Sequence, residues 1–178
     1  MAHAPPRYAP ALPLPARPYR PVRSGPRPPR PLLPALLPPG PARRAWREPA
    51  ALPEPAVTAF HYGVDLFNAA CWWEAHEVWE GLWARTVRGT PLFHLLQGLI
   101  MLAAAQLKAA LAQPRGAQRL AARAREHLAR VQAGAGEPPP LGIAPASAQQ
   151  ACAALQAALE RGATPPRPFL HLAHQAAQ

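Results

Sequence analysis

The sequence contains only two cysteines, Cys71 and Cys152, and they stand far apart in the chain. This number excludes a disulfide scaffold and the paired Cys ligands of a structural zinc site. We therefore expect two reduced thiols, the usual state in the cytoplasm. The sequence also has no Gly-rich phosphate loop and no Ser/His/Asp set, so nucleotide binding and serine-hydrolase chemistry have no motif to support them.

Acidic residues and lysine are also scarce. Nine acidic residues face 19 basic ones, the net charge is +10, and Lys108 is the single lysine. Nine arginines and one acid fall in residues 1–50, whereas residues 57–133 hold eight bases and five acids. The excess positive charge therefore belongs mainly to an N-terminal arm. Such an arm is the part of the chain that would engage nucleic acid or an acidic protein.

The sequence lacks an uninterrupted hydrophobic run of membrane-spanning length. Its most apolar stretch, residues 95–112, contains Gln97, Gln106 and Lys108, which is typical of a buried helix and not of a membrane span. The N-terminus has no apolar core of a signal peptide. We expect a cytoplasmic protein with no membrane partner. No segment alternates as a strand would, so the predicted class is all-α.

Proline divides the chain into parts. Of 27 prolines, 18 lie in residues 1–55, and only Pro91 and Pro114 occur in residues 56–137. Dense proline blocks helix formation and favours polyproline II or disorder. We therefore predict a Pro/Arg-rich extension over residues 1–55, either disordered or packed on the rest. A helical bundle domain follows over residues 56–161, and a loosely held C-terminal tail over residues 162–178.

Periodicity and capping residues predict five helices in the bundle. The expected helices cover residues 57 to 68 or 69, 71–86, 91–112, 116–132 and 147–161. Thr90 and Pro91 are typical of an N-cap and a first helical position. Asn68 and Ser147 are the expected caps of the second and last helices, and Gly162 ends the last one.

The third predicted helix is apolar nearly all round, so it should be the central and most buried element. Gly98 removes a side chain on this helix where another helix could approach closely. We expect such an approach there.

Residues 71–86, CWWEAHEVWEGLWART, hold four of the five tryptophans. At about 100° per residue, the indoles share one helical face with a histidine and a carboxylate. The residues on that face are Trp72, Trp73, His76, Trp79, Glu80 and Trp83. Glu74 and Glu77 fall on the other side. The large apolar area of four indoles predicts that this face is buried.

His76, Glu80 and Trp83 form a contiguous row on that helix, because side chains three and four apart are neighbours. Three interpretations stay open. In the first, His76 and Glu80 hydrogen-bond to each other or to Gln97 and only fix the packing. Alternatively, His76 and Glu80 are two ligands of a divalent metal ion, with further ligands from water or from the set Asp65, His61 and His94. In the third, the pair holds a small polar ligand in an aromatic pocket, with His76 as acid or base.

The predicted ligand-binding residues are His76, Glu80, Trp83, Gln97, Asn68 and Trp73, of which His76 and Glu80 are the metal ligands. Residues 76–80 also form an H-E-x-x-E motif, with His76, Glu77 and Glu80, which is similar to the H-E-x-x-H motif of metalloproteases. The second histidine of that motif is missing, so hydrolysis is the least supported interpretation. The sequence favours a binding protein over an enzyme.

Taken together, these motifs resemble the domain-of-unknown-function 309 family of bacteria and archaea. The resemblance covers residues 57–131. It is carried by H-x-x-x-E-x-x-W at His76, Glu80 and Trp83, by F-N at Phe67 and Asn68, and by Q-G-L-I at residues 97–100. It implies a small helical bundle of unestablished function, for which metal binding has been suggested from the motif.

Some members of that family carry an N-terminal Tyr/Pro-rich stretch ending in P-G-x-x-P-H-P. Residues 17–31 look similar, with Arg27 in place of the histidine. The resemblance thus implies that this stretch lies against the bundle and that no histidine from it contributes to a site. The sequence predicts a domain that holds a metal ion or small polar ligand at His76, Glu80 and Gln97. The alternative is a protein- or nucleic-acid-interaction module that uses the arginine-rich arm, with His76 and Glu80 purely structural.

Overall fold

The structure, a computed structural model, describes residues 6–21, 45–131 and 140–172. Its elements are η1 (Pro49–Ala51), α2 (Glu54–Asn68), α3 (Trp72–Trp83), α4 (Pro91–Ala110), α5 (Pro114–Ala129), η2 (Pro140–Gly142) and α6 (Pro145–Glu160). The described residues contain five α-helices and no strand, so the predicted all-α class is confirmed.

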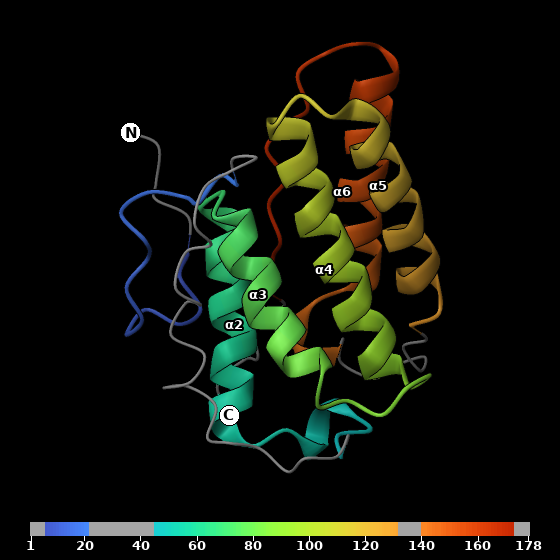
Figure 1. The fold of residues 1–178 in the computed structure, drawn as a ribbon. Helices are drawn as coiled ribbons and strands as arrows, with labels where there is room; N and C mark the ends of the chain where they lie inside the picture. The colour runs from blue at the N-terminus through green and yellow to red at the C-terminus, as the bar shows by residue number, and fades with distance from the viewer. Residues whose placement is uncertain (1–5, 22–44, 132–139, 173–178) are drawn as a thin grey trace.

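Each α-helix packs on the next one along the chain, and α4 also contacts α6. In Figure 1, α4 stands between the α2–α3 pair on one side and the α5–α6 pair on the other. More than half of its residues are buried, among them Leu95, Leu99 and Leu102, which are fully buried. The prediction that this helix is the central one is confirmed. It is not the most buried one, because 10 of the 15 residues of α2 are buried against 11 of the 20 residues of α4.

The predicted close approach at Gly98 is also confirmed. A Cβ atom added there would lie 2.6 Å from Leu128 Cγ and 3.3 Å from the Ala124 carbonyl oxygen, both on α5. The first distance is too short for a real contact and the second is unusually tight, so α4 and α5 can pack this closely only because residue 98 has no side chain.

The predicted helix termini are confirmed at the start of α4 and at the end of α6, and the predicted start of α6 is wrong. The Thr90 side chain accepts a hydrogen bond of 3.2 Å from the Phe93 amide, and Pro91 occupies the first turn, as predicted. Gly162 has φ +62 directly after α6, which also agrees. The proposed cap at Ser147 is wrong: α6 begins earlier, at Pro145, and the Ser147 hydroxyl donates to the Ala144 carbonyl instead.

Helix α3 is rotated relative to the prediction. Its inward stripe consists of Ala75, Val78, Trp79 and Leu82, all fully buried, at the i, i+3, i+4, i+7 spacing of an amphipathic helix. At the helical step, this stripe is centred about 100° from the middle of the indole face. The prediction that the whole indole face is buried is therefore wrong: Trp79 is buried, the other three indoles are half-buried and Glu80 is exposed.

The C-terminal segment is held more firmly than the predicted loose tail. Leu170 is fully buried. Its amide donates to Asn68 Oδ1 (2.8 Å) and its carbonyl accepts from Asn68 Nδ2 (2.9 Å). Arg167 also donates to the Asn68 carbonyl at 2.6 Å. Asn68 therefore fixes this segment to the end of α2, and it does not cap α3, whose N-cap position is Cys71.

Helix α4 is the one helix among the described residues that is long and apolar enough to cross a membrane. In the structure, 61% of its most apolar window is buried inside the protein. This burial fits the expectation of a core helix.

Candidate metal-binding site

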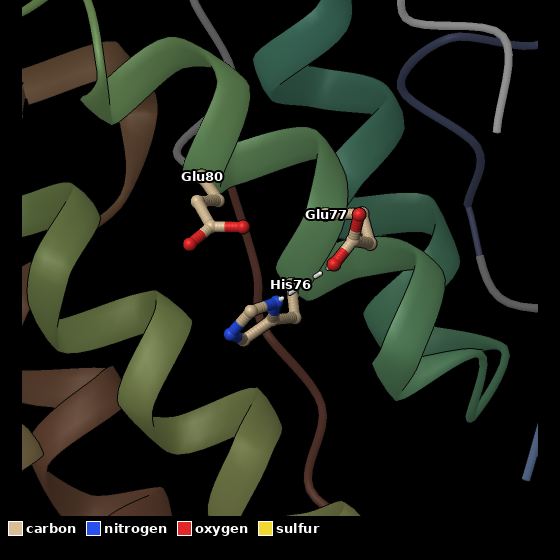
Figure 2. A group of neighbouring side chains, drawn as sticks. All are labelled: His76, Glu77 and Glu80. Atoms are coloured by element: carbon tan, nitrogen blue, oxygen red, sulfur yellow. Dashed lines mark ion pairs between the residues drawn. The ribbon is translucent and has the colours of Figure 1, made fainter. Parts of the chain in front are cut away.

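Three side chains of α3 gather at its surface. One nitrogen of His76 and one carboxylate oxygen each of Glu77 and Glu80 lie within 4.8 Å of one another. His76 Nδ1 lies 3.6 Å from Glu77 Oε1. Figure 2 shows the imidazole near both carboxylates, with the dashed line marking its ion pair with Glu77. No other group of three potential ligands is found in the described part of the chain.

The presence of Glu77 corrects the prediction, which placed this residue on the opposite side of the helix. Neighbouring residues on a helix are about 100° apart, but the long glutamate side chain reaches back toward His76. The H-E-x-x-E motif of residues 76–80 was the sequence signal that Glu77 belongs to this group. The side chains of His76 and Glu77 are 24% and 14% exposed, whereas Glu80 is exposed, so the group lies at the surface and is open to solvent.

Two of the predicted aromatic residues lie on the same helix as this group: Trp73 contacts His76, and Trp83 follows Glu80 by three residues. The Trp73 ring stacks on His76 with 6.0 Å between ring centroids and 14° between ring planes. Trp83 packs against Phe93 of α4 at 5.4 Å. Gln97 is half-buried on α4. Because His76 Nδ1 has no hydrogen-bond partner, the predicted hydrogen-bonded cluster with Gln97 is not formed at that atom.

The other residues considered as ligands are engaged elsewhere. Asn68 uses both its amide groups on Leu170, and Asp65 is buried under the N-terminal segment, where it accepts from Arg7. The ring of His61 lies against Phe60, and His94 contacts His127. The geometry therefore leaves His76, Glu77 and Glu80 as the candidate ligands.

Part of the chain matches a model of a protein family. Residues 60–120 match the family model described as Domain of unknown function (DUF309). The family resemblance inferred from the sequence is thereby confirmed. The DUF309 segment runs from within α2 to within α5, so it contains all of α3 and α4 and the candidate ligands. No curated protein and no solved structure gives a significant match.

The arginine-rich arm is described only in part. Five of its nine arginines, including Arg27, lie in residues 22–44, outside the described residues. Binding of nucleic acid or an acidic protein by the arm therefore stays a prediction.

A second pair of ionisable side chains, His94 and His127, lies where α4 meets α5. His94 Nδ1 and His127 Nδ1 are 2.9 Å apart, so one nitrogen carries the proton that the other accepts. Burial lowers the pKa of His94, and the positive charge of Arg130 lowers it further. Burial also lowers the pKa of His127, together with His94 and Arg130, while Glu126 opposes this effect.

We expect the free energy of unfolding to fall as the pH drops below about 6.5, the histidine pKa of an unfolded chain. The folded pKa values of His94 and His127 are depressed, so below that pH the unfolded chain binds more protons than the folded one. Urea unfolding between pH 7.5 and 5.5 would measure this slope. A His127→Gln variant should have a shallower slope, and an unchanged slope in that variant would contradict the assignment.

Proposed function

We propose that this DUF309 protein binds one divalent transition-metal ion through His76, Glu77 and Glu80. The observation that carries the proposal is the convergence of an imidazole nitrogen and two carboxylate oxygens on one patch of α3. The carboxylates of Glu77 and Glu80 carry like charges and repel each other. A divalent cation between them would remove that repulsion and would also give the buried His76 Nδ1 a partner.

The ligand chemistry narrows the class of metal. Imidazole suits Zn²⁺, Fe²⁺ and related ions, while carboxylates also suit Mn²⁺. One imidazole with two carboxylates therefore favours Zn²⁺, Mn²⁺ or Fe²⁺ over Ca²⁺ and Mg²⁺. Metal–ligand bonds of about 2.0–2.2 Å allow two ligand atoms at most about 4.4 Å apart. The present spread of up to 4.8 Å requires a small contraction, which the exposed Glu80 can supply by rotation.

Three protein ligands would leave coordination positions open to solvent, the arrangement of sites where a metal also binds a small molecule. A small polar ligand that coordinates the ion beside Trp73 and Trp83 would unite the two binding interpretations drawn from the sequence. We place this function in the cytoplasm, where the two free and buried cysteines would stay reduced.

The test uses full-length protein purified without a histidine tag. We expect one Zn²⁺ or Mn²⁺ ion per chain by elemental analysis and a single binding event by calorimetry. Replacing His76 by alanine should weaken binding more than about 100-fold, because removing a ligand costs more than the roughly 10–100-fold lost with its supporting partners.

Glu80→Gln should weaken binding as well, since it removes a ligand charge. The matched control is His127→Ala, which removes another half-buried histidine away from the site and should leave affinity unchanged. Wild-type protein without stoichiometric metal, or equal affinity in wild type and His76→Ala, would refute the proposal.

A further inference from the structure

The N-terminal segment of residues 6–21, which we call the strap, runs along α2 and α3 (Figure 1). Its first anchor is the Asp65 carboxylate, which is 2% exposed. That carboxylate accepts from Arg7 Nε (2.9 Å), from the Tyr8 amide (2.8 Å) and from the Ala9 amide (2.9 Å). A second anchor is the Tyr62 hydroxyl, which donates to the Pro13 carbonyl at 2.7 Å. The strap is therefore a fixed part of the fold.

The far end of the strap reaches α3 beside the candidate ligands. The Tyr19 amide donates to Glu74 Oε1 at 2.8 Å, and Glu74 is itself 7% exposed. The Tyr19 ring meets Trp73 edge-on, with 5.4 Å between centroids and 61° between planes. Trp73 in turn stacks on His76. Three rings thus form a continuous row from the strap to the imidazole.

We propose that Tyr19 is a positioning residue for His76: through Trp73, the strap holds the imidazole in the orientation that a bound metal ion requires. The inference rests on the function proposed above. An exposed Trp73 on the surface of α3 would exchange between rotamers, and the ring of His76 would follow. Contacts with both Tyr19 and His76 restrict Trp73, so the ligand nitrogen is oriented before the ion arrives.

The experiment compares wild type with Tyr19→Ala and Tyr19→Phe in two measurements. The first is calorimetric titration with Zn²⁺. We expect Tyr19→Ala to raise the dissociation constant about 10-fold. This value is the lower end of the roughly 10–100-fold loss of affinity that follows when a group orienting a metal ligand is removed. Tyr19→Phe keeps the ring and should restore wild-type affinity. Thermal melting of the metal-free proteins checks that each variant is folded.

The second measurement needs no metal and records the NMR chemical shifts of the His76 ring protons. These signals are assigned by their absence from the spectrum of His76→Ala. The Trp73 ring current shifts these protons, so a freed Trp73 in Tyr19→Ala should move them toward unstructured values. The matched control is Tyr62→Phe, which removes a strap anchor but leaves Tyr19 in place. It should change neither the shifts nor the affinity.

The outcomes separate the two proposals. If wild type binds no Zn²⁺, the metal-binding function fails, and unchanged His76 shifts in Tyr19→Ala would still overturn the positioning role. If wild type binds Zn²⁺ and Tyr19→Ala binds it equally well, only the positioning role is overturned. Equal weakening in Tyr62→Phe and Tyr19→Ala would assign the effect to general loosening of the strap and would overturn the role of the Tyr19 ring.

Discussion

Replacing Trp79 by alanine is expected to lower the free energy of unfolding by about 3–5 kcal/mol, the range for deleting a large buried aromatic side chain. Trp79 is fully buried and packs between Phe60 and Phe67 of α2, with centroids 6.4 and 6.0 Å away. Its Nε1 also donates to the Phe60 carbonyl at 3.3 Å. The variant leaves a cavity and removes this hydrogen bond, so the loss comes from two sources.

The space around Trp79 cannot close easily, which places the effect in the upper part of that range. A Cβ atom added to Gly63 of α2 would lie 2.7 Å from Trp79 Cε2, so the ring already fills the gap between the two helices. Urea unfolding followed by far-UV circular dichroism measures the change. The matched control is Trp72→Ala, the same substitution on the same helix at a half-buried position.

We expect the Trp72→Ala variant to lose clearly less stability than Trp79→Ala. Equal losses would mean that all four indoles are interior, as the sequence alone predicted, and would contradict the observed rotation of α3.

The second large effect is expected for Asp65→Ala, with a loss of about 3 kcal/mol, the lower end of the range for breaking a buried ion pair. The lower end applies because the Asp65 side chain is fully buried whereas that of Arg7 is 30% exposed. The variant leaves a cation and two amides without their acceptor. Hydrogen exchange should show the local consequence: the amides of Tyr8 and Ala9, which donate to Asp65, should lose their protection.

Asp65→Asn is the matched variant for this prediction, because it keeps the shape and removes the charge. It should retain part of the stability through the remaining amide oxygen. Arg7→Ala tests the pair from the other side and should leave Tyr8 and Ala9 protected, since their acceptor remains. Full protection of both amides in Asp65→Ala would show that the strap is held by other contacts.

Much of the fold followed from local sequence signals. The all-α class, the central place of α4, the Thr90 cap with Pro91, and the close contact at Gly98 depend on periodicity, capping chemistry and the lack of a side chain. The cap and the helical periodicity involve residues near one another in the chain, where the steric and hydrogen-bonding rules act directly. The contact at Gly98 joins two helices, but the missing side chain that permits it is visible in the sequence. The family was likewise recognisable from short motifs within residues 60–120.

The candidate site was predicted only in part. His76 and Glu80 were identified by their spacing on one helix, and Trp73 by its place beside them. Glu77 was assigned to the wrong side, because a helical projection gives the direction of a Cα–Cβ bond and not the reach of a long side chain. Glu74, which anchors Tyr19 of the strap, was missed altogether, since its partner lies 55 residues away in the sequence.

The sequence by itself determined which residues form helices and which of them share a helical face. The tertiary structure decided which face turns inward. For α3, the area of four indoles predicted one face, but packing against α2 and α4 buries the smaller stripe of Ala75, Val78 and Leu82 with Trp79 alone. The physical reason is that burial depends on the neighbours that fit against a face. Those neighbours, like the segments that Asp65 and Asn68 hold, come from distant parts of the chain.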